Sequence, residues 1–143
     1  IPFATDELVV AMNPEHPLAG KDNLSIDELK GVDFIAFEKD IPTRKATDEI
    51  LRNADIEVSI AMEFDNVETV KRALEINAGV AIIPKNTASN EVQRNQLVVS
   101  RLDNGKHIRP LSLIHKKTRM LTPALRSFIE KMQHSPLTEK ISA

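Results

Sequence analysis

The 143-residue sequence contains no cysteine, no tryptophan and no tyrosine. Without cysteine there is no disulfide, no thiolate-bound zinc and no thiol nucleophile. The five phenylalanines are the only aromatic residues, so the core must be built from aliphatic side chains. We therefore do not expect an aromatic-lined pocket for sugars or stacked bases. No apolar run approaches the roughly 20 residues that cross a bilayer, so no membrane span is expected.

The sequence also lacks an excess of basic residues. It has 19 Lys and Arg against 21 Asp and Glu, with the two signs interspersed and a net charge of -2. A domain that grips DNA usually has a basic surplus, so we do not expect this chain to contact DNA itself. No signal peptide pattern opens the chain, which begins at Ile1. We expect a cytoplasmic fragment of a longer protein.

Short apolar runs alternate along the chain with segments of helical spacing. Each of these runs, three to nine residues long, predicts a strand. The predicted strands are Leu8–Met12, Phe34–Phe37, Ile56–Phe64, Val80–Ile83, Leu97–Val99 and Leu111–Ile114. Strands that alternate with helices predict an α/β domain with a mostly parallel sheet flanked by helices.

Capping residues mark where the helices begin. The expected starts are the Ser25 to Glu28 capping box, Pro42, the N-cap Asn66, and Thr122 followed by Pro123. The last of these opens an amphipathic helix, with apolar residues at helical spacing from Leu125 to Met132. The basic turn at Lys116, Lys117 and Arg119 is expected to be solvated, and the polar tail after His134 to be frayed.

The sequence has no motif that would support catalysis. Only four glycines are present and they are far apart, so there is no phosphate-binding loop, and no Gly-x-Ser-x-Gly or His-Glu-x-x-His occurs. The four histidines show no ligand spacing, and His16, between two prolines, is read as a surface turn residue. We therefore expect no enzymatic activity, no metal ion and no cofactor.

Two strand-to-helix junctions are the candidates for ligand binding. Ligands of open α/β sheets lie beyond the carboxyl ends of the strands, where helix N-termini favour anions. The first junction supplies Thr43 and Arg44, whose guanidinium can clamp a carboxylate. The second supplies Phe64, Asn66, Val67 and Thr69. For each residue taken singly a structural role is also open, because Thr43 and Asn66 are good helix starters and Phe64 suits a core.

Three segments resemble the effector-binding domains of LysR-type transcriptional regulators. Residues Glu7–Ala19 combine a strand with an HPLA loop, and Phe64–Pro84 resemble the family's helix, glycine, strand and proline. Residues Arg109–His115 and Leu121–Ile129 are similar to its returning strand and final helix. The resemblance covers about Glu7 to Met132. The family usually has a glycine near position 77, where this chain has Asn77. This is a minor variation in the turn.

The resemblance implies a fold like a type 2 periplasmic binding protein, in which two subdomains joined by crossing strands enclose an effector cleft. Residues from about 13 to 110 would form a complete second subdomain. Residues 1–12 and 111–134 would supply the crossing strands and returning helix of a partial first subdomain. The DNA-binding domain, the linker helix and the opening half of the first subdomain are absent from the chain.

The function that the resemblance implies is a sensory one. A small effector, with an anion as one candidate class, would bind in the cleft and control DNA binding by the full-length protein. The resemblance also implies a homodimer or higher homo-oligomer, with the helix Val67–Asn77 as a candidate contact surface. Two alternatives share the architecture: a solute-binding protein of a transport system, and an enzyme such as a prephenate dehydratase-like or porphobilinogen deaminase-like relative.

Overall fold

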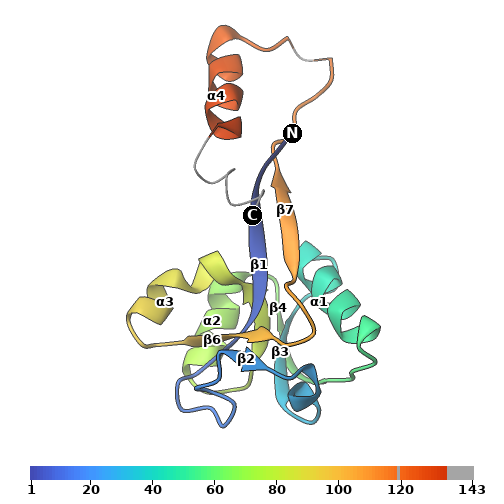
Figure 1. Ribbon diagram of the computed structural model, residues 1–143, viewed down its shortest axis with the longest axis vertical. Coiled ribbons are helices and arrows are strands. Elements are labelled where there is room, and N and C mark those ends of the chain that lie inside the picture. The colour runs from blue at the N-terminus through green and yellow to red at the C-terminus, as the bar shows by residue number, and fades with distance from the viewer. Residues whose placement is uncertain (119, 135–143) are drawn as a thin grey trace. The chain divides into compact units, whose positions relative to one another are not determined.

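A computed structural model describes residues 1–118 and 120–134 (Figure 1). Its elements, in chain order, are β1 (Pro2–Met12), β2 (Asn23–Leu24), the 3₁₀ helix η1 (Ile26–Leu29), β3 (Asp33–Phe37), α1 (Pro42–Asn53), β4 (Ser59–Phe64), α2 (Val67–Glu75), β5 (Ala81–Pro84), the 3₁₀ helix η2 (Lys85–Ala88), α3 (Ser89–Gln93), β6 (Val98–Leu102), β7 (Ile108–Ser112) and α4 (Pro123–Gln133). Arg119 of the predicted basic turn and the predicted frayed tail after His134 lie outside the described residues.

The chain forms two compact units. The larger unit comprises residues 7–107, and the smaller one residues 1–6 with the described residues from Ile108 onward. Strand β1 is continuous from Pro2 to Met12 and belongs to both units. The assignment of residues 13–110 to a second subdomain of a two-subdomain protein stays a prediction.

The sheet of the larger unit has the strand order β4-β3-β5-β1-β6-β2. Backbone hydrogen bonds from Ile35 N to Val80 O (2.8 Å) and from Val80 N to Asp33 O (2.9 Å) join β3 to the residue before β5. Strands β3 and β4 pair in parallel, as do β2 and β6, whereas β1 is antiparallel to both β5 and β6. Five strands therefore share one direction, which confirms the mostly parallel sheet. β1 is the exception because it enters from the smaller unit and does not follow a crossover helix.

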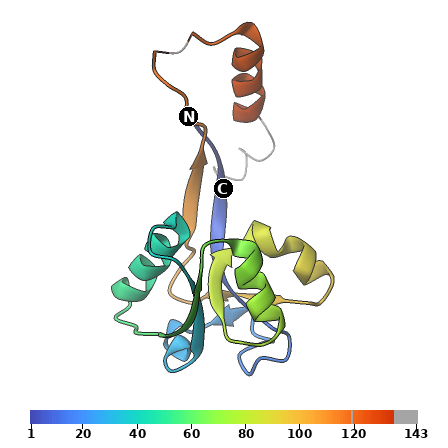
Figure 2. The same ribbon diagram turned by 180° about the vertical axis from the view of Figure 1, so that it is seen from behind.

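Helices cover both faces of this sheet, so its central strands are buried on both sides. Figures 1 and 2 show α1 on one side of the sheet and α2 with α3 on the other. Val10 and Met12 of β1 pack in the cluster that includes α1, whereas Ala11 packs in the cluster that includes α2. This double burial explains why the chain reads LVVAM there, a continuous apolar run and not an alternation.

The predicted helix starts are confirmed by their capping contacts. Pro42 is the first residue of α1. The Asn66 side chain accepts a hydrogen bond from Thr69 N at 2.9 Å, and Thr122 Oγ1 accepts one from Leu125 N at 3.3 Å. At the Ser25 capping box, Ser25 N donates to the Glu28 carboxylate at 3.1 Å, but the element is a single 3₁₀ turn.

The strand boundaries at the unit border were predicted incorrectly. β1 begins at Pro2 and not at Leu8, and β7 spans Ile108–Ser112 and not Leu111–Ile114. A search for apolar runs misses both segments because they mix apolar with polar residues, and they are extended because β7 pairs with β1. β4 is also shorter than predicted and starts at Ser59.

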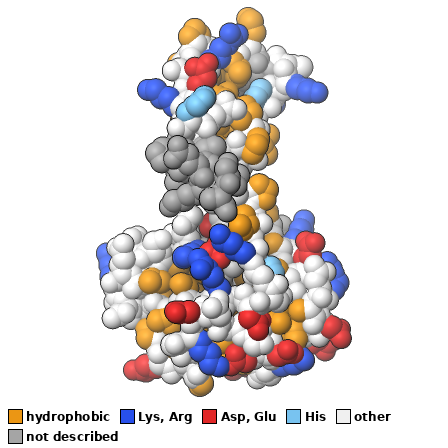
Figure 3. All heavy atoms as spheres, in the orientation of Figure 1, with side chains coloured by type: hydrophobic (Ala, Val, Ile, Leu, Met, Phe, Trp, Pro, Cys, Tyr) orange, Lys and Arg blue, Asp and Glu red, His pale blue; other side chains and the backbone are white. Residues whose placement is uncertain are grey.

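The described residues of the smaller unit form no interior comparable to that of the larger one. Neither hydrophobic cluster includes any of its residues, and α4 has no buried residue along its described length. The apolar side chains of the predicted amphipathic face are present but uncovered, with Phe128 51% exposed. Figure 3 shows hydrophobic side chains at the surface of this part of the molecule.

Candidate functional site

The two predicted junctions lie at neighbouring strand ends. β3 and β4 pair in parallel up to their last residues, Phe37 and Phe64, and Glu38 N then donates to Phe64 O at 2.9 Å. α1 starts five residues after β3, and α2 starts three residues after β4. Both helix N-termini therefore lie at the carboxyl edge of the sheet, where their backbone dipoles favour an anion.

The Arg44 side chain is buried, and it forms hydrogen bonds to residues of α1, β3 and β4. Its Nη1 donates to Phe37 O at 2.6 Å and to Glu63 Oε1 at 2.9 Å, and its Nε donates to Asp48 Oδ1 at 2.9 Å. Burial alone would lower the pKa of Arg44, but the hydrogen bonds to Glu63 and Asp48 outweigh it and raise the pKa above its usual value. The guanidinium is thus a permanent cation that ties α1 to the ends of β3 and β4.

Thr43 precedes Arg44 in the first turn of α1 and is also buried. Its carbonyl accepts a hydrogen bond from Thr47 Oγ1 at 2.9 Å. The cap of α1 is Ile41, whose side chain cannot accept a hydrogen bond, while its carbonyl accepts from Arg44 N at 3.0 Å. The Arg44 side chain and the Thr43 carbonyl of this junction are therefore engaged in contacts within the fold.

The α2 junction is more open to solvent. Asn66 is exposed, and its Oδ1 accepts hydrogen bonds from the backbone N (2.9 Å) and Oγ1 (3.1 Å) of Thr69. Phe64 and Val67 are half-buried against the cluster beneath α2. The structure therefore groups Phe64, Asn66, Val67 and Thr69 at one strand end, beside the end that carries Thr43 and Arg44.

A third parallel strand end, which the sequence reasoning missed, completes the edge. β5 ends at Pro84 and is followed by η2, whose Thr87 carbonyl accepts from the buried Lys71 Nζ at 3.1 Å. Lys71 Nζ is also 2.8 Å from Glu91 and 2.9 Å from Glu68. The rule that located the first two junctions applies equally to Pro84, but the polar segment after it was interpreted only as a helix or turn.

The ion pairs of Lys71 change its titration and that of Glu91. Burial alone would lower the pKa of Lys71, but its hydrogen bonds to Glu91 and Glu68 raise it above the usual value. The hydrogen bond from Lys71 holds the pKa of Glu91 below its usual value of 4.5. Both groups are therefore charged at neutral pH, and they fix α2 against η2 and α3.

Glu7 of β1 forms ion pairs with two basic side chains of the larger unit. Arg101 Nε donates to Glu7 Oε1 at 2.9 Å, and Lys85 Nζ is 3.9 Å from Glu7 Oε2. Acidic and basic side chains are interspersed over the face of the larger unit that Figure 3 shows.

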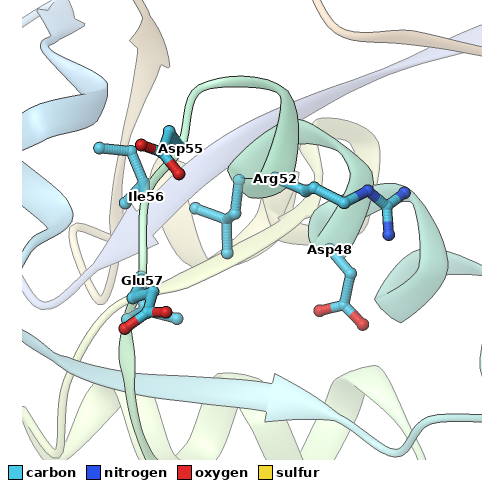
Figure 4. A pocket seen from close by; sticks show the side chains of 7 residues that line it. Asp48, Arg52, Asp55, Ile56 and Glu57 are labelled. Atoms are coloured by element: carbon cyan, nitrogen blue, oxygen red, sulfur yellow. The ribbon is translucent and has the colours of Figure 1, made fainter.

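A surface hollow of about 430 Å³ lies at the opposite end of α1 from the predicted site. Figure 4 shows Asp48 and Arg52 extending from the helix, with Asp55, Ile56 and Glu57 on the segment that follows it. Asp48 is already paired with Arg44. The hollow therefore lies away from the strand ends and is not part of the candidate site.

The described part of the chain offers no metal site and no membrane span. Within residues 1–118 and 120–134, no group of three or more His, Asp or Glu side chains is placed to hold a metal ion. No helix within the same residues is both long and apolar enough to cross a bilayer.

The comparisons with known proteins show which class of binding domain this is. The family model described as LysR substrate binding domain matches residues 1–135, and the chain belongs to this family. A probable RuBisCO transcriptional regulator of Synechocystis is 27% identical over 135 residues, which are 92% of this chain and 39% of the relative. The RuBisCO operon transcriptional regulator of Allochromatium vinosum is 27% identical over 128 residues, 90% of this chain and 42% of the relative.

Solved structures show the same fold. The regulatory domain of Synechocystis CcmR, in complex with 2-PG, superposes with a TM-score of 0.84 at 26% identity, covering 93% of this chain and 64% of that one. The effector-binding domain of QuiR, in complex with shikimate, has a TM-score of 0.81 at 22% identity over 93% of this chain and 62% of that one. The type 2 periplasmic-binding-protein-like fold is confirmed. The chain spans about two fifths of the length of these curated relatives.

Proposed function

We propose that this chain is the effector-sensing part of a cytoplasmic LysR-type transcriptional regulator. A small anionic effector binds at the carboxyl ends of β3 and β4 and changes how the full-length protein binds DNA, which a different domain contacts. The observation that carries the proposal is the pairing of the two strand ends, because it brings two helix N-termini to one edge of the sheet. The proposal includes no catalytic step and no cofactor.

The predicted contact residues divide into two kinds in this proposal. Asn66 and Thr69 make direct polar contacts, since they are the more accessible and their bonds to one another are local. Phe64 and Val67 supply an apolar wall. Arg44, with Thr43 beside it, acts on the anion through its charge and does not contact the anion directly. Three protein acceptors already bind its guanidinium.

A thermal-shift screen with 2-PG and small carboxylates tests the proposal. A ligand at 100 times its Kd adds about 2.7 kcal/mol of stability, which corresponds to a shift of roughly 2–8 °C. We expect the shift to shrink in Asn66→Ala and Thr69→Val and to persist in Lys30→Ala, a surface change away from this edge. A panel that produces no shift in the wild-type chain would contradict the proposal.

We also propose that the full-length protein is a homo-oligomer and that β4 belongs to its contact surface. The apolar face of α2, the surface first considered, is used within the unit, since Val70, Ala73 and Leu74 are buried. β4 is an edge strand with Ile60 42% and Met62 41% exposed, and such edges favour association. Met62→Lys should shift the full-length protein toward monomer in sedimentation experiments, whereas an unchanged oligomer would exclude β4 from the interface.

A further inference from the structure

The turn that joins β6 to β7 is fixed at both of its ends and exposed at its tip. At its start, Asp103 N donates to Leu24 O at 3.0 Å, and at its end, His107 O accepts from Leu8 N at 2.8 Å. Residues 104–106 between these two bonds are exposed. The whole turn lies within the larger unit. Water therefore reaches the tip while the backbone on either side of it is held.

The tip contains the one Asn-Gly pair of the sequence, Asn104 and Gly105. Gly105 has a φ of +130°, and a Cβ at this residue would meet no atom within 4 Å. Because glycine has no Cβ, its backbone nitrogen is unshielded and its peptide group can turn toward the Asn104 side chain. A backbone nitrogen that reaches the carboxamide carbon of a preceding asparagine can attack it, which is one reason why asparagine is thermolabile.

The side chain of His107 contacts the carboxamide of Asn104. Nε2 of the ring lies 2.8 Å from Asn104 Oδ1. An amide oxygen only accepts, so Nε2 carries the hydrogen and donates it. Burial lowers the pKa of His107 below its usual 6.5, so the ring is neutral at neutral pH and this N–H is its single donor. A donor at this oxygen stabilises the negative charge that develops there when a nucleophile adds to the carboxamide carbon.

We propose that Asn104 is a self-modification site, at which Gly105 N displaces the side-chain amide with His107 as the assisting hydrogen-bond donor. Gly105 N gives its proton to hydroxide and forms a bond to Cγ of Asn104. The Cγ–Nδ2 bond then breaks, and Nδ2 takes up a proton and leaves as ammonia. Water opens the resulting succinimide at either carbonyl, which gives aspartate or isoaspartate. No electrons are transferred, and the net change is the uptake of a water molecule and the release of ammonia.

The reaction changes the charge and, in one product, the length of the turn through which the chain leaves the larger unit. Both products add a negative charge beside Asp103, and isoaspartate also adds a carbon to the main chain. The backbone bonds from Asp103 to Leu24 and from Leu8 to His107 lie outside the altered peptide, so we expect the fold of the larger unit to be retained. The reaction needs no effector, so it is independent of the proposed function.

Peptide mapping with a heavy-oxygen label tests the proposal. The chain is incubated at neutral pH and physiological temperature in water enriched in the heavy isotope, and it is then digested with trypsin in ordinary water. Cleavage after Arg101 and Lys106 isolates residues 102–106. We expect labelled aspartate and isoaspartate to accumulate at Asn104, whereas Asn77, an exposed asparagine followed by alanine, should convert far more slowly.

Substitutions then test the role of each group. Gly105→Ala adds a Cβ next to the attacking nitrogen and should remove most of the conversion, and Asn104→Gln, which would require a larger ring, should remove it. His107→Leu removes the donor and should slow the conversion about two- to tenfold, the effect of a single hydrogen bond. His107→Gln retains an amide N–H and should slow it less, and it replaces the leucine variant if that variant does not fold. In urea, where the contact is lost, the wild-type chain and His107→Leu should convert at the same rate.

Three results would contradict the proposal. Conversion at Asn104 that is no faster than at Asn77 would show that the turn is not a modification site. Equal or faster conversion in folded His107→Leu would exclude His107 from the reaction. A difference between the wild-type chain and His107→Leu that persists in urea would assign the effect to the local sequence and not to the contact in the folded chain.

Discussion

The two units of this chain differ in how they bury apolar surface. The larger unit encloses a cluster on each face of its sheet, with α1 over one and α2 over the other. The smaller unit has a helix of comparable length, α4, whose described residues include none that is buried. Leu125, Phe128 and Ile129 line a shallow depression with Leu113 and Ile114 of the same unit.

The difference shows that an amphipathic helix is not by itself a stabilising element. Like α2, α4 has apolar residues at helical spacing, yet among the described residues only α2 has a sheet against which to pack. Burial against a second layer supplies most of the stability of a helix in a protein. We therefore expect the free energy of unfolding to reside almost wholly in the larger unit, and substitutions in both units test that expectation.

The largest effect should follow from emptying the core of the larger unit. Phe34 of β3 is fully buried in the cluster beneath α1. Phe34→Ala should lower the free energy of unfolding by about 3–5 kcal/mol, because it removes the transfer free energy of the ring and leaves a cavity. Urea unfolding followed by circular dichroism measures this, and a loss below about 1 kcal/mol would show that the cluster is not a packed core.

Removing the buried cation of α2 should cost about 3 kcal/mol at neutral pH. Lys71→Met removes the buried partner of Glu91, a carboxylate whose side chain is itself only 15% exposed. Arg72→Met, the neighbouring change, removes only an exposed pair with Glu75 and should cost less than about 1 kcal/mol. The same unfolding measurement compares the two, and equal losses would refute the buried role of Lys71.

The same pair predicts a pH dependence. The pKa of Glu91 is lower in the folded chain than its usual 4.5, so its contribution is present above pH 4.5 and is lost as pH falls through the folded value. The pKa of Lys71 is raised above 10.5, so its contribution is present below that pH and is lost as pH rises through the folded value. Lys71→Met should flatten both limbs of the stability profile, and a profile parallel to that of the wild type would contradict this assignment.

Two glycines offer a matched test of backbone packing in the larger unit. A Cβ at Gly79 would collide with the carbonyl of Asp33, whereas one at Gly105 meets no atom within 4 Å, and both residues have positive φ. Gly105→Ala should cost about 1–2 kcal/mol from backbone strain alone. Gly79→Ala should cost more, about 2 kcal/mol or above. Thermal denaturation ranks the two, and the reverse order would contradict the close approach of β3 to this turn.

The smallest effect should come from the phenylalanine of the smaller unit. Phe128 is half-exposed on α4. Phe128→Ala should change the free energy of unfolding of this chain by no more than about 0.5 kcal/mol, as at other surface positions. A loss that approaches the loss from Phe34→Ala would show that α4 packs on a core and would abolish the contrast between the units.

The fold was predictable from sequence wherever a local chemical pattern determines it. Pro42, Asn66 and Thr122 begin helices because each satisfies or avoids an unpaired backbone donor, and this depends on a few neighbouring residues. The polar parts of β1 and β7 were missed because they are extended through pairing with each other. Such pairing joins residues about a hundred positions apart and leaves no periodic trace.

The strand ends at which the candidate residues lie were predictable from sequence, whereas the contacts that these residues make were not. The strand-end rule groups the residues from Phe64 to Thr69 correctly beside Thr43 and Arg44. It does not reveal that Arg44 is held by Phe37, Asp48 and Glu63, because those acceptors come from three different elements. The buried role of Lys71 was not predicted either, because a lysine on a helix is ordinarily solvated. Its partners Thr87 and Glu91 lie on other elements.

The two ends of the larger unit are neighbours in space. Leu8 N donates to His107 O at 2.8 Å, so the chain enters and leaves this unit within one hydrogen bond. A compact body whose ends meet can replace a surface loop of an unrelated host without stretching it. Residues 7–107 are thus a candidate cassette for insertion into a surface loop of another protein.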